Sequence, residues 1–254
     1  MRHVFNPRFR RGDLVLLLST YVLIFILGFF IAVLLNVSDQ QGLQHLEMSG
    51  PLGATANVVA ARNDGTGSIG EMSVEIRQGE GRILFDTNPF SIPDIQFSAQ
   101  KAVSVTQTYT KKNLGNKDII VSFDVEGGLI GGESAGAAMA SAMIAAIDGK
   151  TLKQDVAITG TIETDGSIGP VAGIPEKIQA AAGAGIKVFL LPKGQLEMAY
   201  YVPMTRTEEV YPGFFYDKNY YVRKTLNLRE LGAELGLDVI EVQDIRQALT
   251  YLFA

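Results

Sequence analysis

Residues 131–147 read GGESAGAAMASAMIAAI, and this stretch decides the fold. Two glycines form a turn, and the small side chains after it are typical of a helix that neighbouring backbones approach closely. A strand expected at residues 119–125 leads into the glycines, and Asp148-Gly149 ends the helix. We therefore expect a buried central helix that begins close to Ser134.

The rest of the domain shows the alternating and helical patterns of further strands and helices. Residues 63–67 read NDGTG, a turn signal between two strand patterns, so these two strands are expected to form a β-hairpin. Strands are expected at residues 55–62, 71–77, 81–85, 119–125, 156–161 and 186–191, and further helices at residues 95–110 and 175–183.

Ser134 and Lys177 form the pair of residues that could carry chemistry. The chain contains no cysteine and only two histidines, His3 and His45, so a histidine-based triad or a clustered metal site has almost nothing to be built from. A buried lysine can act as the base that a serine nucleophile needs. A Ser-Lys dyad is therefore the leading option for covalent catalysis, and we expect neither a metal nor a cofactor.

Each of these two residues also has a purely structural interpretation. Ser134 could cap the helix that follows it, as serines commonly do. Lys177 could be solvated, because residues 175–183 resemble an exposed amphipathic helix. If Ser134 is a nucleophile, the free N–H groups and the positive dipole end of the following helix suit an oxyanion. The local sequence leaves both interpretations open.

Two glycine patterns resemble nucleotide-binding motifs but lack what those motifs need. Residues 65–70 match the G-x-G-x-x-G of dinucleotide-binding folds, yet that motif requires a following helix, and here the sequence continues with the alternation of a strand. Residues 127–134 copy the spacing of a phosphate-binding P-loop, but Glu133 stands where that loop requires lysine. A carboxylate there would repel phosphate, so we expect no ATP binding.

Residues 14–35 are predicted to form a transmembrane anchor. They comprise 22 consecutive uncharged positions, of which 17 are Leu, Ile, Phe or Val. As a helix they would extend about 33 Å, against roughly 30 Å for the hydrocarbon core of a bilayer. A cleavable signal peptide is the alternative, but its apolar region is usually about 7–15 residues long, and no A-x-A-like cleavage site follows here.

Charge predicts the orientation of this anchor. Residues 1–13 carry four arginines and one aspartate, and arginine-rich short tails stay in the cytoplasm. We therefore expect a cytoplasmic tail (1–13), a linker (36–53) and an extracytoplasmic domain (54–254), held at the cell membrane by a single span. The whole chain has a net charge of −5 although its tail is basic, so the domain is acidic and no nucleic-acid partner is expected.

Residues 131–194 resemble the proteolytic domain of Lon peptidases. The resemblance rests on the Ser-Ala-Gly core at Ser134, on Thr159-Gly160, on the run GSIGPVAGIPEK that ends at Lys177, and on the AGIK and LPK motifs that follow. Ser134 and Lys177 are 43 positions apart, which agrees with the order and layout of that family. More narrowly, the chain is similar to archaeal membrane-anchored Lon-like serine proteases that lack the ATPase module.

The resemblance implies an α+β domain with the Lon proteolytic fold. It implies that Ser134 is the nucleophile and Lys177 the general base, and that Thr159 orients the Lys177 ammonium group. In this mechanism the backbone amides near Ser134 and Ala135 hold the oxyanion. Lysine at its ordinary pKa of roughly 10.4 is protonated at neutral pH, so burial must lower the pKa of Lys177 by several units.

Two positions depart from the family pattern. Glu133 replaces a proline that is common before the nucleophile in bacterial members, and Thr161 stands in place of the glutamate of the usual Thr-Gly-Glu. The geometry of the dyad before substrate binds is therefore open.

The function we expect is ATP-independent hydrolysis of peptide bonds in unfolded or membrane-proximal proteins by a membrane-anchored serine endopeptidase. One alternative is a catalytically silent, membrane-tethered peptide-binding module of the same fold. Another is a Ser-Lys amidase that acts on small amides. Because Lon-type domains suggest rings, we also consider a homo-oligomer.

Residues 200–221 contain eight aromatic side chains, a high density for so short a segment. Ordinary core packing would explain them. A surface that meets substrate, another subunit or the bilayer interface would explain them equally well.

Overall fold

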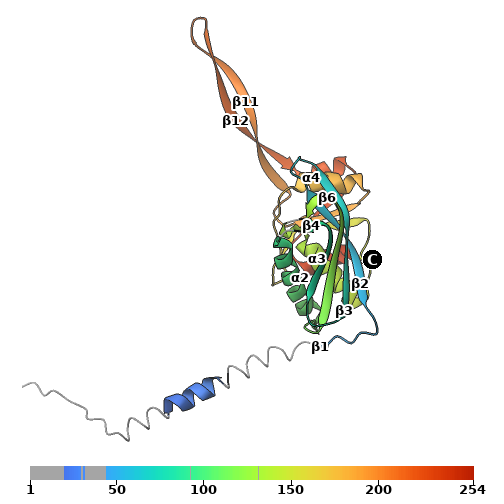
Figure 1. Ribbon diagram of the computed structural model, residues 1–254. Coiled ribbons are helices and arrows are strands. Elements are labelled where there is room, and N and C mark those ends of the chain that lie inside the picture. The colour runs from blue at the N-terminus through green and yellow to red at the C-terminus, as the bar shows by residue number, and fades with distance from the viewer. Residues whose placement is uncertain (1–19, 30, 32–43, 92, 131) are drawn as a thin grey trace, which may run out of the picture. The chain divides into compact units, whose positions relative to one another are not determined.

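The computed structural model describes residues 20–29, 31, 44–91, 93–130 and 132–254 (Figure 1). The chain forms two compact units, Met1–Gln44 and His45–Ala254. In the first unit, residues 20–29 are helical. No helix within the described residues has both the length and the apolar character needed to cross a membrane. The expected tail, and parts of the expected anchor and linker, lie outside the described residues.

The described strands and helices follow the chain in this order. The strands are β1 (Gln44–His45), β2 (Leu52–Ala61), β3 (Gly67–Gln78), β4 (Ile83–Ser91), β5 (Lys112–Asn113), β6 (Lys117–Ile130), β7 (Val156–Ile158), β8 (Thr161–Ile162), β9 (Ile168–Gly169), β10 (Val188–Pro192), β11 (Glu197–Tyr211), β12 (Phe214–Asn227) and β13 (Asp238–Val242). The helices are α2 (Asp94–Thr110), the 3-10 turn η1 (Glu133–Ala135), α3 (Gly136–Asp148), α4 (Ile174–Gly183), α5 (Leu228–Glu234) and α6 (Ile245–Leu252).

A seven-stranded mixed sheet forms the centre of the second unit, in the order β13-β10-β7-β2-β3-β6-β4. The strands β13, β10, β7 and β2 run parallel to their neighbours in this series. In contrast, β3 runs antiparallel to both β2 and β6, and β4 runs parallel to β6 at the other edge. The expected combination of helices with a sheet of both strand directions is therefore present.

Helices cover both faces of the sheet around β2, because successive residues of a strand point to opposite faces. Val58 belongs to one hydrophobic core with side chains of α2, α3 and α6, whereas Val59 belongs to the other with side chains of α4 and α5. The small side chains predicted a central position for α3, and this prediction is confirmed: its residues are buried through Ala146. Helix α3 packs between α2 and the sheet (Figure 1).

The strands β2 and β3 form the expected β-hairpin. Its turn is held by Asp64, whose carboxylate accepts hydrogen bonds from the N–H and the hydroxyl group of Thr66. The glycine pattern at residues 65–70 leads into β3 and not into a helix. The helix that a dinucleotide-binding motif requires is thus replaced by a strand at this point.

Two strands differ from their predicted bounds. The strand β7 already ends at Ile158, because the N–H of Gly160 turns away and donates to the carbonyl of Ser134. The strand β10 begins later than expected, because the N–H of Ile186 donates to the carbonyl of Ala181 in α4. In both cases a neighbouring turn or helix competes with the sheet for a backbone donor, which a local alternation pattern does not reveal.

The strands β11 and β12 form a separate antiparallel ribbon that projects from the rest of the second unit (Figure 1). This ribbon carries the aromatic segment at residues 200–221. Core packing is the wrong interpretation of these aromatic side chains, because all eight are exposed, from 40% at Tyr220 to 71% at Tyr211 and Tyr221. The ribbon is therefore a surface whose partner lies outside the folded core.

Candidate active site

Ser134 lies in the short turn η1, which joins β6 to α3. Gly132, just before the turn, has a φ of +84°, a conformation that residues with a side chain rarely adopt. The N-cap of α3 is Ala135, and no side-chain hydrogen bond caps the helix. The interpretation of Ser134 as a helix cap is therefore wrong. Its side chain is partly exposed and free of any capping contact.

The segment Thr159-Gly160 lies against this turn. The N–H of Gly160 donates to the Ser134 carbonyl at 2.9 Å, and the Gly160 carbonyl accepts from the N–H of Ala137 at 3.1 Å. A side chain on Gly160 would collide with Ile168, so this close approach requires glycine. These contacts fix the backbone of Ser134 beside the end of β7.

Lys177 lies in the first turn of α4 and is buried, with only 3% of its surface exposed. Its interpretation as a solvated surface lysine is therefore wrong. Burial lowers the pKa of Lys177 to about 8, and the charge of Glu176 acts weakly in the opposite direction. The neutral amine is thus accessible at mildly alkaline pH.

Thr159 connects Lys177 to the turn that carries Ser134. The Lys177 amine donates a hydrogen bond to Oγ1 of Thr159 at 3.1 Å, and Thr159 is fully buried. The Thr159 hydroxyl in turn donates to the Ser134 carbonyl oxygen at 3.4 Å. Among the described atoms, no hydrogen bond joins the Lys177 amine directly to the Ser134 hydroxyl. Catalytic hydrogen bonds without bound substrate are often long and tighten in the complex.

A charged cluster supports the turn from the side of α2. The Lys101 amine lies 3.0 Å from a carboxylate oxygen of Glu133 and 3.2 Å from one of Glu163. On the same helix, the Ser98 hydroxyl donates to the Glu133 carbonyl at 3.3 Å. These two carboxylates raise the pKa of Lys101 through hydrogen bonds. Lys101 therefore ties the residue before Ser134 to the end of β8.

Gln195 supports the loop that leads to Lys177. Its side-chain amide donates to the carbonyl of Val171 at 2.8 Å, and its amide oxygen accepts from the Val171 N–H at 3.0 Å. The N–H of Gln195 is in turn held by the Glu241 carboxylate on β13. This contact connects the base of the β11–β12 ribbon to the approach to α4.

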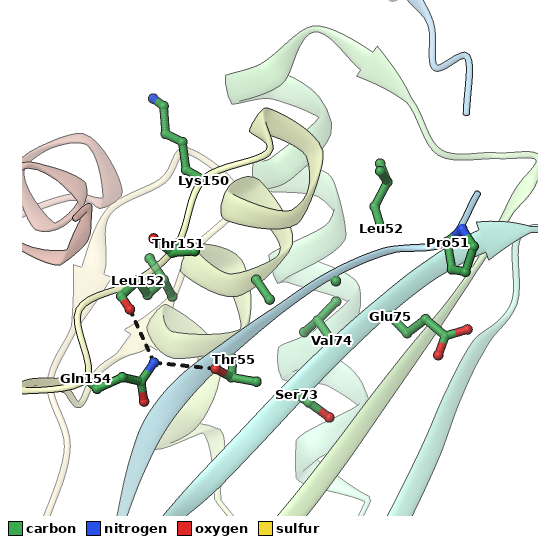
Figure 2. A pocket seen from close by; sticks show the side chains of 12 residues that line it. Pro51, Leu52, Thr55, Ser73, Val74, Glu75, Lys150, Thr151, Leu152 and Gln154 are labelled. Atoms are coloured by element: carbon green, nitrogen blue, oxygen red, sulfur yellow. Dashed lines mark hydrogen bonds between the residues drawn. The ribbon is translucent and has the colours of Figure 1, made fainter. Parts of the chain in front are cut away.

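A cavity of about 540 Å³ lies elsewhere, between the start of β2, the adjacent part of β3 and the segment after α3 (Figure 2). Gln154 spans it at one side and donates hydrogen bonds to Thr55 and to the Leu152 carbonyl. Neither Ser134 nor Lys177 lines this cavity. Within the described residues, no group of three or more His, Cys, Asp or Glu side chains could hold a metal ion.

Comparison with known families places the geometry around Ser134 and Lys177 in context. Residues 67–211, more than half of the chain, match the Lon protease (S16) C-terminal proteolytic domain. The chain belongs to this family. The matched region contains η1, Thr159 and α4, so all of the residues proposed from the sequence lie within the Lon proteolytic domain.

Several Lon proteases are similar to the chain over this domain. The Archaeal Lon protease of Archaeoglobus fulgidus is 32% identical over 135 residues, which is 51% of this chain and 20% of that protein. The Lon protease of Vibrio parahaemolyticus is 34% identical over 134 residues, or 50% of this chain and 17% of that protein. The chain thus matches about a fifth of the length of these relatives.

Lys101, Glu163 and Gln195 are the members of the Lon-type site region that the sequence did not point to. Lys101 lies on a helix whose exposed face is expected to carry charge, and its partners are 32 and 62 positions away in the sequence. Gln195 looks like an ordinary loop residue. Only the LPK motif that precedes it, through its resemblance to the Lon family, directs attention to this loop.

Proposed function

We propose that this Lon-type domain is a serine endopeptidase in which Ser134 attacks the peptide carbonyl and Lys177 is the general base. The observation that carries the proposal is the burial of Lys177, which lowers the pKa of its amine to about 8. A lysine outside a charge-rich environment has no structural need for such burial, since desolvating an ammonium group costs free energy. A base, in contrast, requires it.

The reaction proceeds through an acyl-enzyme. The neutral Lys177 amine removes the proton of the Ser134 hydroxyl as Oγ bonds to the substrate carbonyl carbon. The resulting ammonium then gives this proton to the leaving amine, and the peptide C–N bond breaks. Water, deprotonated by the same amine, attacks the ester and releases the acyl group. Backbone N–H groups at Ser134 and Ala135, where η1 meets α3, stabilise the oxyanion.

Thr159 orients the base in this proposal. Its hydroxyl accepts a hydrogen bond from the Lys177 amine and so directs the remaining substituents of nitrogen. Because the same hydroxyl bonds to the Ser134 carbonyl, the amine and the nucleophile are held in a fixed relation through one residue.

The substrates we propose are unfolded or membrane-proximal polypeptides, cleaved without ATP. The P-loop-like residues 127–134 carry Glu133 in place of the phosphate-binding lysine, and this carboxylate is paired with Lys101. Membrane anchoring through residues 14–35, an extracytoplasmic domain and assembly into a homo-oligomer complete the proposal. A tightly folded protein should resist cleavage, and digestion of one at the rate of a casein-like substrate would contradict it.

Substitution of the two central residues tests the assignment. Ser134→Ala and Lys177→Ala should each abolish the cleavage of an unfolded protein, measured by the release of peptides, while the melting temperature shows that the domain remains folded. Lys177→Arg should also be inactive, because a guanidinium group does not deprotonate. Ser141→Ala, which changes a buried serine on α3 that bonds only to the helix backbone, is the matched control and should keep activity.

A catalytically silent peptide-binding module is the second candidate function. It is favoured by one observation, the missing direct hydrogen bond between the Ser134 hydroxyl and the Lys177 amine. A fluorophosphonate probe separates the two functions, because it labels only an activated serine. Labelled Ser134 in the folded chain supports the endopeptidase, and binding of peptide without labelling supports the silent module.

A further inference from the structure

The tip of the β11–β12 ribbon carries a surface that the proteolytic reaction does not use. We propose that this tip, residues 210–216, inserts into the interfacial region of a lipid bilayer composed of neutral, zwitterionic phospholipids. The proposal goes beyond proteolysis and does not depend on it. It concerns only the ribbon, and residues 210–216 are called the ribbon tip below.

The ribbon tip is uncharged, aromatic and exposed. It reads VYPGFFY, and its four rings have exposed fractions of 71% at Tyr211, 62% at Phe214 and Phe215, and 50% at Tyr216. Neither hydrophobic core includes any of these residues. Exposed phenylalanine side chains are unfavourable in water, whereas amphipathic aromatic rings are enriched where a bilayer meets water.

The ribbon tip is convex, which favours lipid over a protein partner. Phe215 and Tyr216 are neighbours in β12, so their rings point to opposite faces of the ribbon. Tyr211 pairs with Phe214 at the very end. Rings therefore project on both faces and at the end, and no single flat stripe is available. A protein partner would need a pocket complementary to this shape, but a bilayer surrounds it without one.

The turn is held in place before any partner binds. Gly213 has a φ of +80°, as a tight hairpin turn requires. Its N–H donates a hydrogen bond at 2.8 Å to the carboxylate of Glu209 on the opposite strand. Because the turn is already ordered, insertion would not have to order this part of the backbone.

Charges directly behind the tip limit the depth of insertion. Each arm of the ribbon tip has about three uncharged residues, or about 10 Å at roughly 3.3 Å per residue, close to the 5–10 Å reached by interfacial segments. Three carboxylates against two cations make this boundary slightly acidic, so anionic lipid would be repelled and neutral lipid is favoured. The charged residues are Glu208, Glu209, Asp217 and the facing pair Arg206 and Lys218.

The second copy of this chain is the competing occupant. Two ribbons could meet through their tips, but the four rings present little area compared with the roughly 800 Å² per partner of a stable interface. The sequence also predicts an anchor at residues 14–35 in the same chain, so a bilayer is the apolar surface that the chain is expected to meet.

A single tryptophan tests the proposal, because the natural chain contains none. The full chain with Phe215→Trp is mixed with phosphatidylcholine vesicles whose acyl chains carry bromine. Since interfacial side chains reach the acyl boundary, the emission should shift to shorter wavelength and fall by about half relative to unbrominated vesicles. Tyr221→Trp, at an equally exposed position on the shaft of the ribbon, is the matched control and should not be quenched.

The readout does not depend on how the rest of the chain binds vesicles. If residues 14–35 hold the chain at the bilayer, both reporters are held equally and only the tip reporter is quenched. Adding Phe214→Glu to the Phe215→Trp chain should restore at least about half of the lost emission, because a charge opposes insertion. This variant should fold normally, since the ribbon tip lies outside both cores.

Three results would overturn the proposal. The first is a tip tryptophan that stays unquenched at every lipid concentration. The second is equal quenching with and without Phe214→Glu, which would show that the tip rings do not control insertion. The third is a shift to shorter wavelength that needs no lipid and grows with protein concentration, which would indicate that a second copy covers the tip.

Discussion

The Nζ atom of Lys177 lies 3.1 Å from the Oγ1 atom of Thr159, and both side chains are buried. The partner of this buried amine is therefore a neutral hydroxyl and not a carboxylate. A carboxylate would stabilise the ammonium form and raise the pKa of Lys177, whereas a hydroxyl orients the amine with little effect on its charge. This relationship is what makes the lysine suitable as a base.

Activity should rise with pH through the pKa of Lys177. The pKa is lowered from 10.5 to about 8 by burial, so the protonated form dominates below pH 8 and the neutral base above it. With one such group, the neutral fraction grows from about one tenth at pH 7 to about nine tenths at pH 9, so kcat/KM should increase roughly tenfold and then level off. Measurement with a short peptide substrate suffices, and a profile that is flat or falls over this range would contradict the assignment.

Glu176→Gln should shift this profile to lower pH. The charge of Glu176 raises the pKa of its neighbour Lys177, so its removal lowers the pKa further and leaves more neutral amine near pH 7. The midpoint of kcat/KM against pH is the quantity to compare. Glu197→Gln, at an exposed position at the start of the ribbon, is a control that should leave the midpoint in place. A shift to higher pH in Glu176→Gln would show that the sign of this interaction is wrong.

Thr159→Val should lower kcat while KM changes little. Valine has a similar shape but no hydroxyl, so the Lys177 amine loses its hydrogen-bond partner in a buried position. Loss of about 1.5–3 kcal/mol corresponds to a decrease of about 10- to 100-fold in kcat. Thr159→Ser keeps the hydroxyl and should recover most of the rate. If Val and Ser variants lose activity equally, the hydroxyl does not position the base.

Lys101→Met should reduce kcat several-fold with little change in stability. The ion pairs of Lys101 are partly solvated, so their loss should cost less than about 1 kcal/mol of folding free energy. The turn before Ser134 would, however, lose the contact that fixes Glu133. Lys187→Met, at an exposed position before β10, is the matched control. Equal kcat values for the two variants would mean that the cluster is not needed to hold the turn.

The sequence predicted those parts of the fold that local patterns determine. The run of small residues identified α3, and alternation on either side of an Asn-Asp-Gly turn identified the β2–β3 hairpin. It could not predict where β7 ends, because Gly160 donates its N–H to Ser134, a contact between segments far apart in the chain. The local pattern alone left the solvation of Lys177 open, since the start of α4 looks amphipathic whether the helix lies on the surface or covers a site.

The ribbon shows why composition alone does not decide burial. An aromatic strand that packs in a core and one that projects into solvent have the same side chains, and only the number of neighbouring strands distinguishes them. In this chain β11 pairs with β12 alone, so neither strand is covered by the main sheet. The eight aromatic residues of segment 200–221 were therefore compatible with both arrangements until the pairing was known.

The most direct test of the central claim is the mapping of a fluorophosphonate adduct by peptide mass spectrometry on the folded full chain. The account predicts a single adduct on Ser134, a labelling rate that rises with pH through about 8 as Lys177 loses its proton, and no labelling in Lys177→Arg. An unlabelled Ser134 in folded wild-type protein, or labelling that persists unchanged in Lys177→Arg, would contradict the claim that these two residues act as nucleophile and base.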